Sequence, residues 1–190
     1  MAATPSTMLP LGTSAPDFAL PDPSGHLVSL DSLEGPALLV AFLSNHCPYV
    51  KRVADGLGEL ARDLQAQGVA VVGIGANDVA NYPDDRPEMM AKMAEAHGWT
   101  FPYLYDESQE TAQAYRAACT PDFFLFDADR RLVYRGQMDG ARPSNDLPVT
   151  GEDLRAAVDA VLAGRPVPDD QRPSMGCNIK WKPGNEPAYP

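Results

Sequence analysis

Blocks of apolar residues alternate with amphipathic stretches along this chain. The six-residue run Leu38–Leu43 predicts a buried strand, because a strand covered on both faces is apolar throughout. Apolar residues then recur at helical spacing from Pro48 to about Gln67, and Gly68 follows as a C-terminal stop. A second apolar run, Val69–Gly75, predicts another buried strand. A strand–helix–strand unit of this size predicts a parallel pair with a right-handed crossover.

The same alternation continues in shorter elements towards the C-terminus. We expect Thr150 to cap the last helix, with Asp153 at the third position of a capping box and Gly164 just past the end. This order of elements is typical of an α/β protein with a central sheet flanked by helices. The pattern predicts short strands at residues 27–30, 101–105, 123–126 and 132–135, and helices at 88–97, 108–118 and 150–163.

The two ends of the chain differ from this central body. Residues 1–11 are interpreted as an N-terminal extension, residues 12–164 as one domain, and residues 165–190 as a proline-rich C-terminal tail. The six prolines of the tail predict irregular structure, since proline lacks a backbone N–H and disrupts helices and sheets. Met175 and Ile179 can still anchor the tail to the domain.

Composition narrows the class of protein and its partners. The formal net charge of −11 argues against nucleic acid and anionic membrane surfaces. No apolar stretch is long enough to cross a bilayer, and the N-terminus lacks the basic start and apolar core of a secretory signal. Three widely spaced cysteines do not fit a disulfide framework. We therefore expect a cytoplasmic protein with a few functional thiols.

Cys47 is the residue at which the pattern points to chemistry. It follows the first buried strand, and Pro48 after it suits the first position of a helix. A sulfur at a helix N-terminus meets free N–H groups and the positive end of the helix dipole, which favour the thiolate. Since the thiolate is the reactive form, the sequence predicts thiol redox chemistry. The alternative is that Cys47 is a small buried apolar residue.

Three segments then occur in a recognisable order: Gly12–Phe18, Phe101–Asp106 and Thr120–Pro121. They resemble a Gly-x-x-Ala-Pro-Asp-Phe opening, a segment that ends in an acid before the third helix, and a cis-proline loop. All three are features of the redoxin branch of thioredoxin-fold proteins, the alkyl hydroperoxide reductase and thiol-specific antioxidant type. The resemblance covers roughly residues 12–162. It implies a thioredoxin fold: a central mixed sheet flanked by helices, with an N-terminal extension and an irregular C-terminal tail.

Two further motifs, Asn45–Val50 and Gly176–Lys182, resemble those of a peroxiredoxin-like thioredoxin family that carries Asn-His-Cys-Pro-Tyr-Val and Gly-Cys-Asn-Ile-Lys-Trp-Lys. This resemblance implies a thiol-dependent oxidoreductase in which Cys47 attacks disulfides or peroxides. The implied partners are protein or small-molecule disulfides, peroxides and a thiol reductant. No cofactor and no metal are expected.

The chain departs from both parent patterns. Thioredoxins place a second cysteine three residues after the first, where this chain has Val50. The subgroup usually has a cysteine at the position of Ser44, so the chain contains no Cys-x-x-Cys. Peroxiredoxins carry Thr or Ser at the position of Ser44, which fits, but a proline at the position of Val40, which does not. Their active-site arginine has no positional match, and Arg52 and Arg116 are the candidates to replace it.

A solitary nucleophile needs a second thiol to resolve the mixed disulfide that it forms. Cys119, two residues before Pro121, is the better internal candidate, because the cis-proline loop of the fold faces the active-site cysteine. Cys177 in the tail is the other candidate, by a swinging motion. His46 can tune the pKa of Cys47.

Other polar residues have simpler interpretations. The run Pro83–Pro87 predicts a solvated loop. No ligand spacing supports a metal site among the cysteines and His46.

Two classes of function stay open. In the first, the chain is an enzyme in which Cys47 acts with Ser44, Cys119 and Pro121. Cys119, Cys177 or an external thiol then resolves the product that Cys47 forms. In the second, the missing Cys-x-x-Cys and arginine mark a catalytically inactive binding or chaperone-like module. The oligomeric state is left open.

Overall fold

A five-stranded mixed sheet forms the centre of the molecule. The structure, a computed structural model, describes residues 3–189. The spatial order of the strands is β6-β5-β4-β8-β9, in which β4, β5 and β6 run parallel and β8 and β9 run antiparallel to their neighbours. The strands span Leu38–Phe42 (β4), Ala70–Gly75 (β5), Tyr103–Tyr105 (β6), Asp122–Phe126 (β8) and Leu132–Gly136 (β9). The expected α/β fold with a thioredoxin-like mixed sheet is confirmed.

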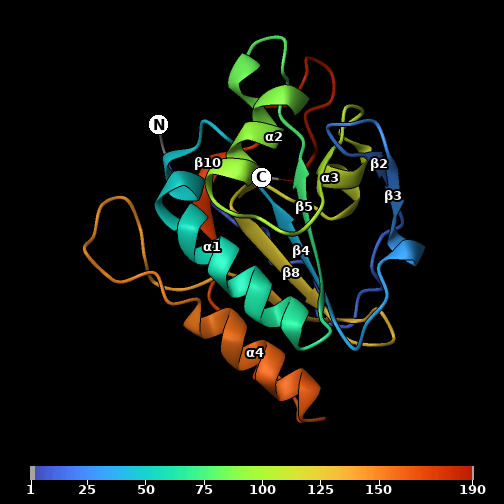
Figure 1. The fold of residues 1–190 in the computed structure, drawn as a ribbon, viewed down its shortest axis with the longest axis vertical. Helices are drawn as coiled ribbons and strands as arrows, with labels where there is room; N and C mark the ends of the chain where they lie inside the picture. Colours follow the sequence, from blue (N-terminus) through green and yellow to red (C-terminus); the bar gives the residue numbers. More distant parts are fainter. Residues whose placement is uncertain (1–2, 190) are drawn as a thin grey trace.

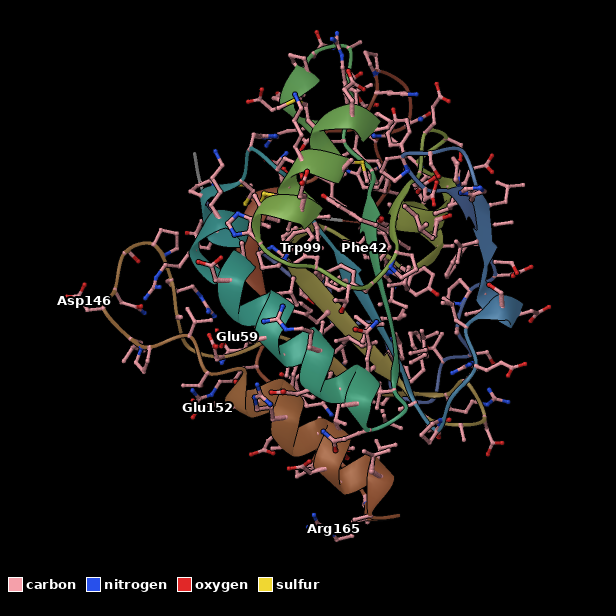
Figure 2. The ribbon with its side chains drawn as sticks, viewed as in Figure 1. Phe42, Glu59, Trp99, Asp146, Glu152 and Arg165 are labelled. Carbon is pink, nitrogen blue, oxygen red and sulfur yellow. The ribbon has the colours of Figure 1, made fainter. Side chains whose placement is uncertain are left out.

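Helices cover both faces of this sheet (Figure 1). One face carries α1 (Pro48–Ala66), α2 (Pro87–Ala96) and α4 (Glu152–Leu162), and the other carries α3 (Glu110–Ala114). The parallel strand–helix–strand unit β4–α1–β5 is as predicted. Figure 2 shows Phe42 inside the molecule, whereas the charged side chains of the helix surfaces point outward.

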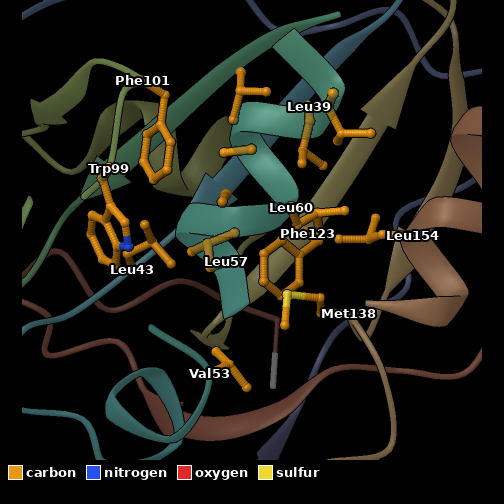
Figure 3. Packing of buried hydrophobic residues seen from close by; sticks show 14 of the residues in the cluster. Leu39, Leu43, Val53, Leu57, Leu60, Trp99, Phe101, Phe123, Met138 and Leu154 are labelled. Carbon is orange, nitrogen blue, oxygen red and sulfur yellow. The ribbon is translucent and has the colours of Figure 1, made fainter. Parts of the chain in front are cut away.

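Strand β4 divides the core in two, because successive side chains of a strand point to opposite faces. Leu39, Ala41 and Leu43 face α1 and pack with Leu57, Leu60, Phe123 and Leu154, several of which are drawn in Figure 3. Leu38, Val40 and Phe42 face the other side and pack with Phe124 and with Tyr115 just after α3. All residues of β4 are fully buried. A continuous apolar run is therefore what this position requires.

Several short elements complete the domain. The hairpin strands β2 and β3 lie beside α3 in Figure 1. Their bounds are Ala19–Pro21 (β2) and Leu27–Ser29 (β3), and the 3-10 turns are Leu30–Ser32 and Pro83–Asp85. Within residues 3–189, no helix is long and apolar enough to span a membrane.

A second, three-stranded sheet joins the two ends of the chain to the domain. Its order is β1-β10-β7, with antiparallel pairing throughout. The strands are Thr4–Pro5 (β1), Met175–Asn178 (β10) and Cys119–Thr120 (β7). Most of the tail is irregular as expected, but its centre forms the middle strand of this sheet. Figure 1 shows β10 beside the N-terminal end of α1.

Two boundaries differ from the sequence prediction. Helix α3 ends four residues earlier than expected, and Arg116 beyond it adopts a left-handed φ of 51° that a helix cannot continue through. The predicted capping box of α4 is wrong, because Gly151 takes the N-cap position and Asp153 accepts a hydrogen bond from Gln137 instead. The Asp139 carboxylate accepts the N–H groups of Thr150 and Gly151.

Candidate active site

Cys47 lies at the junction between β4 and α1. It is the N-cap residue of α1, its backbone is extended, and Pro48 follows at the first helical position. Its carbonyl accepts the first helical hydrogen bond, from the N–H of Lys51 at 3.0 Å. The side chain is fully buried among apolar residues. The sulfur therefore lies at the helix N-terminus, as the sequence predicts.

The cis-proline loop faces this sulfur. The peptide bond between Thr120 and Pro121 is cis, in agreement with the resemblance. The thiol of Cys47 donates to the carbonyl oxygen of Thr120 at 3.1 Å. The loop thus contacts the candidate nucleophile directly through its backbone.

Cys177 is the cysteine that contacts Cys47. Strand β10 places Cys177 opposite Thr120, whose carbonyl already contacts Cys47. Cys47 and Cys177 lie in the same buried cluster, on either side of the Thr120 backbone contact. Burial first, and then the neighbouring Cys47 sulfur, raise the pKa of Cys177 to about 12, while the charge of Lys180 lowers it. Cys177 is held in a strand, so no swinging motion is needed to bring it to Cys47.

Cys119 lies close by but in a different environment. It is fully buried on β7, opposite Asn178 of β10, and its thiol donates to the carbonyl oxygen of Pro121 at 3.8 Å. Burial, and next the charge of Asp122, raise its pKa far above the ordinary value of a thiol. Cys119 is therefore held in the protonated form.

The turn before Cys47 is organised by a residue that sequence reasoning missed. The carboxylate of Asp85 accepts the N–H of Asn45 at 2.5 Å, the Ser44 hydroxyl at 3.1 Å, and the ring Nδ1 of His46 at 2.6 Å. Asn77 adds a fourth donor at 2.8 Å. Burial raises the pKa of Asp85, but the hydrogen bonds from His46 and Asn77 outweigh it, so that the pKa lies below its usual value.

The prediction that residues 83–87 form a solvated loop is wrong at Asp85, which is only 4% exposed, although Asp84 beside it is exposed. The predicted topology could have indicated the burial of Asp85. Strands β4 and β5 are parallel, so the loops after them leave the same edge of the sheet. An acid in the loop after β5 is therefore positioned to reach the turn after β4.

His46 is fixed in one orientation. An ionised carboxylate only accepts hydrogen bonds, so Nδ1 carries the proton that it shares with Asp85. The ring of His46 stacks on the ring of Tyr82, with centroids 5.2 Å apart. The ammonium group of Lys180, two residues after β10, lies 5.7 Å from the centroid of the Tyr82 ring. The buried Nε2 atom has no hydrogen-bond partner within residues 3–189.

Tyr103 closes the site from β6. Its hydroxyl donates to the side-chain oxygen of Asn45 at 3.2 Å. Burial, followed by the charges of Asp85 and Cys47, raises the pKa of Tyr103 well above its usual value. Tyr103 therefore remains a neutral donor at the base of the turn.

Asp122 is a second buried carboxyl group near the cis-proline loop. It is fully buried, and burial raises its pKa to about 7. The nearby hydroxyls of Ser6 and Ser174 donate elsewhere, to the Met8 sulfur and to the Gly136 carbonyl oxygen. Among the described residues, neither oxygen of Asp122 has a hydrogen-bond partner of good geometry.

The arginines considered from the sequence are engaged elsewhere. Arg52 donates to the carbonyl oxygen of Leu147 at 2.7 Å, and the Arg116 guanidinium lies over the ring of Tyr189. The part of the chain that the structure describes contains no group of three or more His, Cys, Asp or Glu residues that could hold a metal ion.

The family can now be stated from a direct match. The AhpC/TSA family model matches residues 11–135, which include Cys47, Asp85 and the cis-proline loop. The chain belongs to the AhpC/TSA family. A curated relative, the thiol-disulfide oxidoreductase ResA of Geobacillus kaustophilus, is 29% identical over 125 residues, 65% of this chain and 67% of that protein.

Two solved structures resemble the whole AhpC/TSA chain much more closely. An uncharacterized conserved protein from Geobacillus kaustophilus has a TM-score of 0.94 and 54% identity, covering 97% of this chain and 98% of its own. A hypothetical protein from Sinorhizobium meliloti 1021 has the same TM-score and identity over 95% and 100%. The family match ends before α4 and β10, so these two structures extend the likeness into the tail. The family match and the similarity to thiol-disulfide oxidoreductase ResA identify the AhpC/TSA chain as an enzyme of the thiol-disulfide oxidoreductase or peroxiredoxin-like type.

Proposed function

We propose that this protein is a thiol–disulfide oxidoreductase in which Cys47 is the nucleophile and Cys177 the resolving thiol. The observation that carries the proposal is the placement of Cys177 opposite Thr120, the cis-proline loop residue whose carbonyl accepts the Cys47 thiol at the N-terminus of α1. A dithiol pair is what disulfide exchange requires. The pair is assembled from two distant parts of the chain in place of a Cys-x-x-Cys motif.

The reaction follows from this pair. The Cys47 thiolate attacks one sulfur of a disulfide R–S–S–R′, forming a Cys47–S–R bond and releasing R′–S⁻, which takes up a proton. Cys177 then loses its proton and attacks the Cys47 sulfur, which forms the Cys47–Cys177 disulfide and releases R–S⁻. Two thiols of the enzyme are oxidised, and one disulfide of the partner is reduced.

The electrostatics favour this order of steps. Part of the raised pKa of Cys177 comes from the charge of the neighbouring Cys47 sulfur. Once Cys47 is bonded to the partner it carries no charge, so this contribution disappears. The charge of Lys180 still lowers the pKa of Cys177. The resolving thiol therefore ionises more readily after the mixed disulfide has formed than before.

The surrounding residues have positioning roles. Asp85 holds Ser44, Asn45 and His46, and so fixes the turn that delivers Cys47 to the helix. Because the Ser44 hydroxyl donates to Asp85, the geometry favours disulfides over peroxides as substrates. The thiol reductant and the cytoplasmic location stay predictions.

Mass spectrometry of the protein after oxidation by a small disulfide tests the proposal. We expect a Cys47–Cys177 linkage in the wild type and in the matched control Cys119→Ser. Cys177→Ser should accumulate the mixed disulfide on Cys47 and lose turnover with a dithiol donor, down to the level of Cys47→Ser. A Cys47–Cys119 linkage, or full turnover by Cys177→Ser, would contradict the assignment of Cys177.

A further inference from the structure

Both sulfurs of the proposed pair are closed off from solvent. Cys47 is 0% exposed and Cys177 is 4% exposed. Disulfide exchange requires direct contact between the attacking sulfur and a sulfur of the partner. A protein disulfide cannot make that contact with the chain in this arrangement.

Strand β10 is the element that stands over Cys47. It lies between β1 and β7, and its Cys177 pairs with Thr120, the residue whose carbonyl contacts Cys47. Gly176 makes the closest approach, because a Cβ at this position would lie 1.9 Å from the Thr120 carbonyl oxygen. Only glycine permits strand β10 to lie this close to the cis-proline loop.

Hydrogen bonds hold both ends of β10, and those on its C-terminal side are the more numerous, because the Lys180 carbonyl oxygen also accepts from Asp78 and Gln109. On its N-terminal side, the Ser174 hydroxyl donates to Gly136 and its carbonyl accepts from Ser6 at 2.9 Å. On the C-terminal side, Ile179 donates to the Ala118 carbonyl at 3.0 Å, and Lys180 donates through its backbone N–H to Asn77 at 2.8 Å. The preceding residues 163–174 form no helix or strand, and β10 pairs with β1 and β7 in the small sheet. It can therefore separate from β7 by turning about its anchored C-terminal side without unfolding the central sheet.

We propose that β10 is a cover that must separate from β7 before a protein disulfide reaches Cys47, and that the Cys47–Cys177 disulfide then fastens the cover shut. The second half rests on the proposed function, whereas the first half depends on the geometry alone. In the reduced protein the cover is held by non-covalent contacts and opens transiently. In the oxidised protein the new S–S bond ties the middle of β10 to the start of α1.

The first test compares how fast a small and a large maleimide modify Cys47 in the reduced protein, with peptide mass spectrometry to identify the site. N-ethylmaleimide and a maleimide attached to a polyethylene glycol chain of about 5 kDa share one reactive group, and glutathione calibrates their intrinsic rates. A partial separation of β10 from β7 admits N-ethylmaleimide, whereas the polyethylene glycol reagent needs full separation. If full separation is about ten times rarer than partial separation, the large reagent is slowed about tenfold beyond that calibration.

A pair of glycine variants identifies β10 as the cause. Gly176→Ala places a Cβ against the Thr120 backbone and should remove the size discrimination at Cys47. Gly140→Ala is the matched control, since its Cβ would meet only the flexible Leu147 side chain, and it should behave as the wild type. Equal relative rates for both reagents in the wild type would overturn the proposal. So would unchanged discrimination in Gly176→Ala.

Hydrogen exchange of the wild type keeps the proposal testable if Gly176→Ala does not fold. In the reduced protein, amides of residues 174–179 should exchange faster than those of β4 and together with those of residues 118–120. Oxidation should slow both segments. Exchange no faster than that of β4 in the reduced protein would refute the cover. If mass spectrometry finds no Cys47–Cys177 disulfide, the proposed function and the fastening fail, while the maleimide comparison still decides whether β10 covers Cys47.

Discussion

Asp85, at the turn before Cys47, and Asp122, next to the cis-proline, are two buried carboxyl groups that behave in opposite ways. Asp85 is 4% exposed and Asp122 is 0% exposed. The pKa of Asp85 is nevertheless lowered, and that of Asp122 is raised to about 7. Similar burial therefore does not give a similar charge.

The difference lies in the donors around each group. Asp85 receives hydrogen bonds from a backbone N–H, a hydroxyl, an imidazole and an amide. The hydroxyls near Asp122 donate to other acceptors. A buried carboxylate is stable only when donors replace the water that it has lost. The turn before Cys47 is thus built around a fixed negative charge, and the loop after the cis-proline around a group that is neutral below about pH 7.

The largest expected effect concerns Asp122. Its pKa is higher in the folded protein than the usual 3.8, so the folded state retains a proton between about pH 4 and 7 that the unfolded state releases. Stability is therefore complete below pH 4 and is lost as the pH rises through 7. Asp122→Asn should remove this loss, which amounts to about 4 kcal/mol between pH 4 and 8 and is measured by urea unfolding. Asp129→Asn, at an exposed turn, should leave the pH dependence unchanged, and equal slopes for Asp122→Asn and the wild type would show that Asp122 is ionised throughout.

The next largest effect concerns Asp85, for which stability depends on pH in the opposite direction from Asp122. Its lowered pKa contributes stability above pH 4 that is lost as the pH falls through the folded-state pKa. Asp85→Asn should cost about 2 kcal/mol at pH 7, because an amide cannot accept from all four donors and leaves buried groups unpaired. Cys47 alkylation should change as well, because the turn that positions it loosens. Asp84→Asn, whose side chain is exposed, is the control. Equal unfolding free energies for the two variants would argue against an organising role for Asp85.

The smallest expected effect comes from removing His46, one of the four hydrogen-bond donors to Asp85. His46→Ala removes one charge-assisted hydrogen bond to Asp85 and should cost about 1 kcal/mol, since the His46 side chain is partly exposed. The pKa of Asp85 should rise, which carboxyl NMR titration can follow. His26→Ala, at an exposed histidine that also lies beside a carboxylate, should leave Asp85 unaffected. An unchanged Asp85 titration in His46→Ala would mean that the other three donors hold the charge alone.

The sequence predicted those parts of the fold that are determined by residues close together in the chain. The apolar runs at β4 and β5 and the helical spacing of α1 are long enough to be unambiguous, and Cys47 lies at the helix N-terminus that Pro48 indicated. The cis peptide bond before Pro121 also agrees with the motif that suggested it.

The missed features all depend on contacts between distant segments. Asp85 is buried because the loop after β5 packs on the turn after β4. The polar, exposed residues beside Asp85 in the sequence give no indication of this packing. The capping box of α4 failed because residues of a separate loop take its place: the Asp139 carboxylate accepts the Thr150 N–H, and the Met138 carbonyl accepts the Asp153 N–H. The contact of Cys177 with Cys47 depends on the close approach that Gly176 allows, and a proline-rich tail gives no local sign of it.

The small sheet β1-β10-β7 has a consequence for how this protein can be shortened or fused. The residues that match the family, 11–135, hold the nucleophile but neither β1 nor β10. A chain trimmed to that match would keep Cys47 and Cys119 but lose Cys177 and the strand that covers Cys47. A large fusion at the N-terminus would adjoin the strand that flanks β10. The position of a reporter or affinity tag therefore has to be chosen so that the pairing of β1 with β10 is kept.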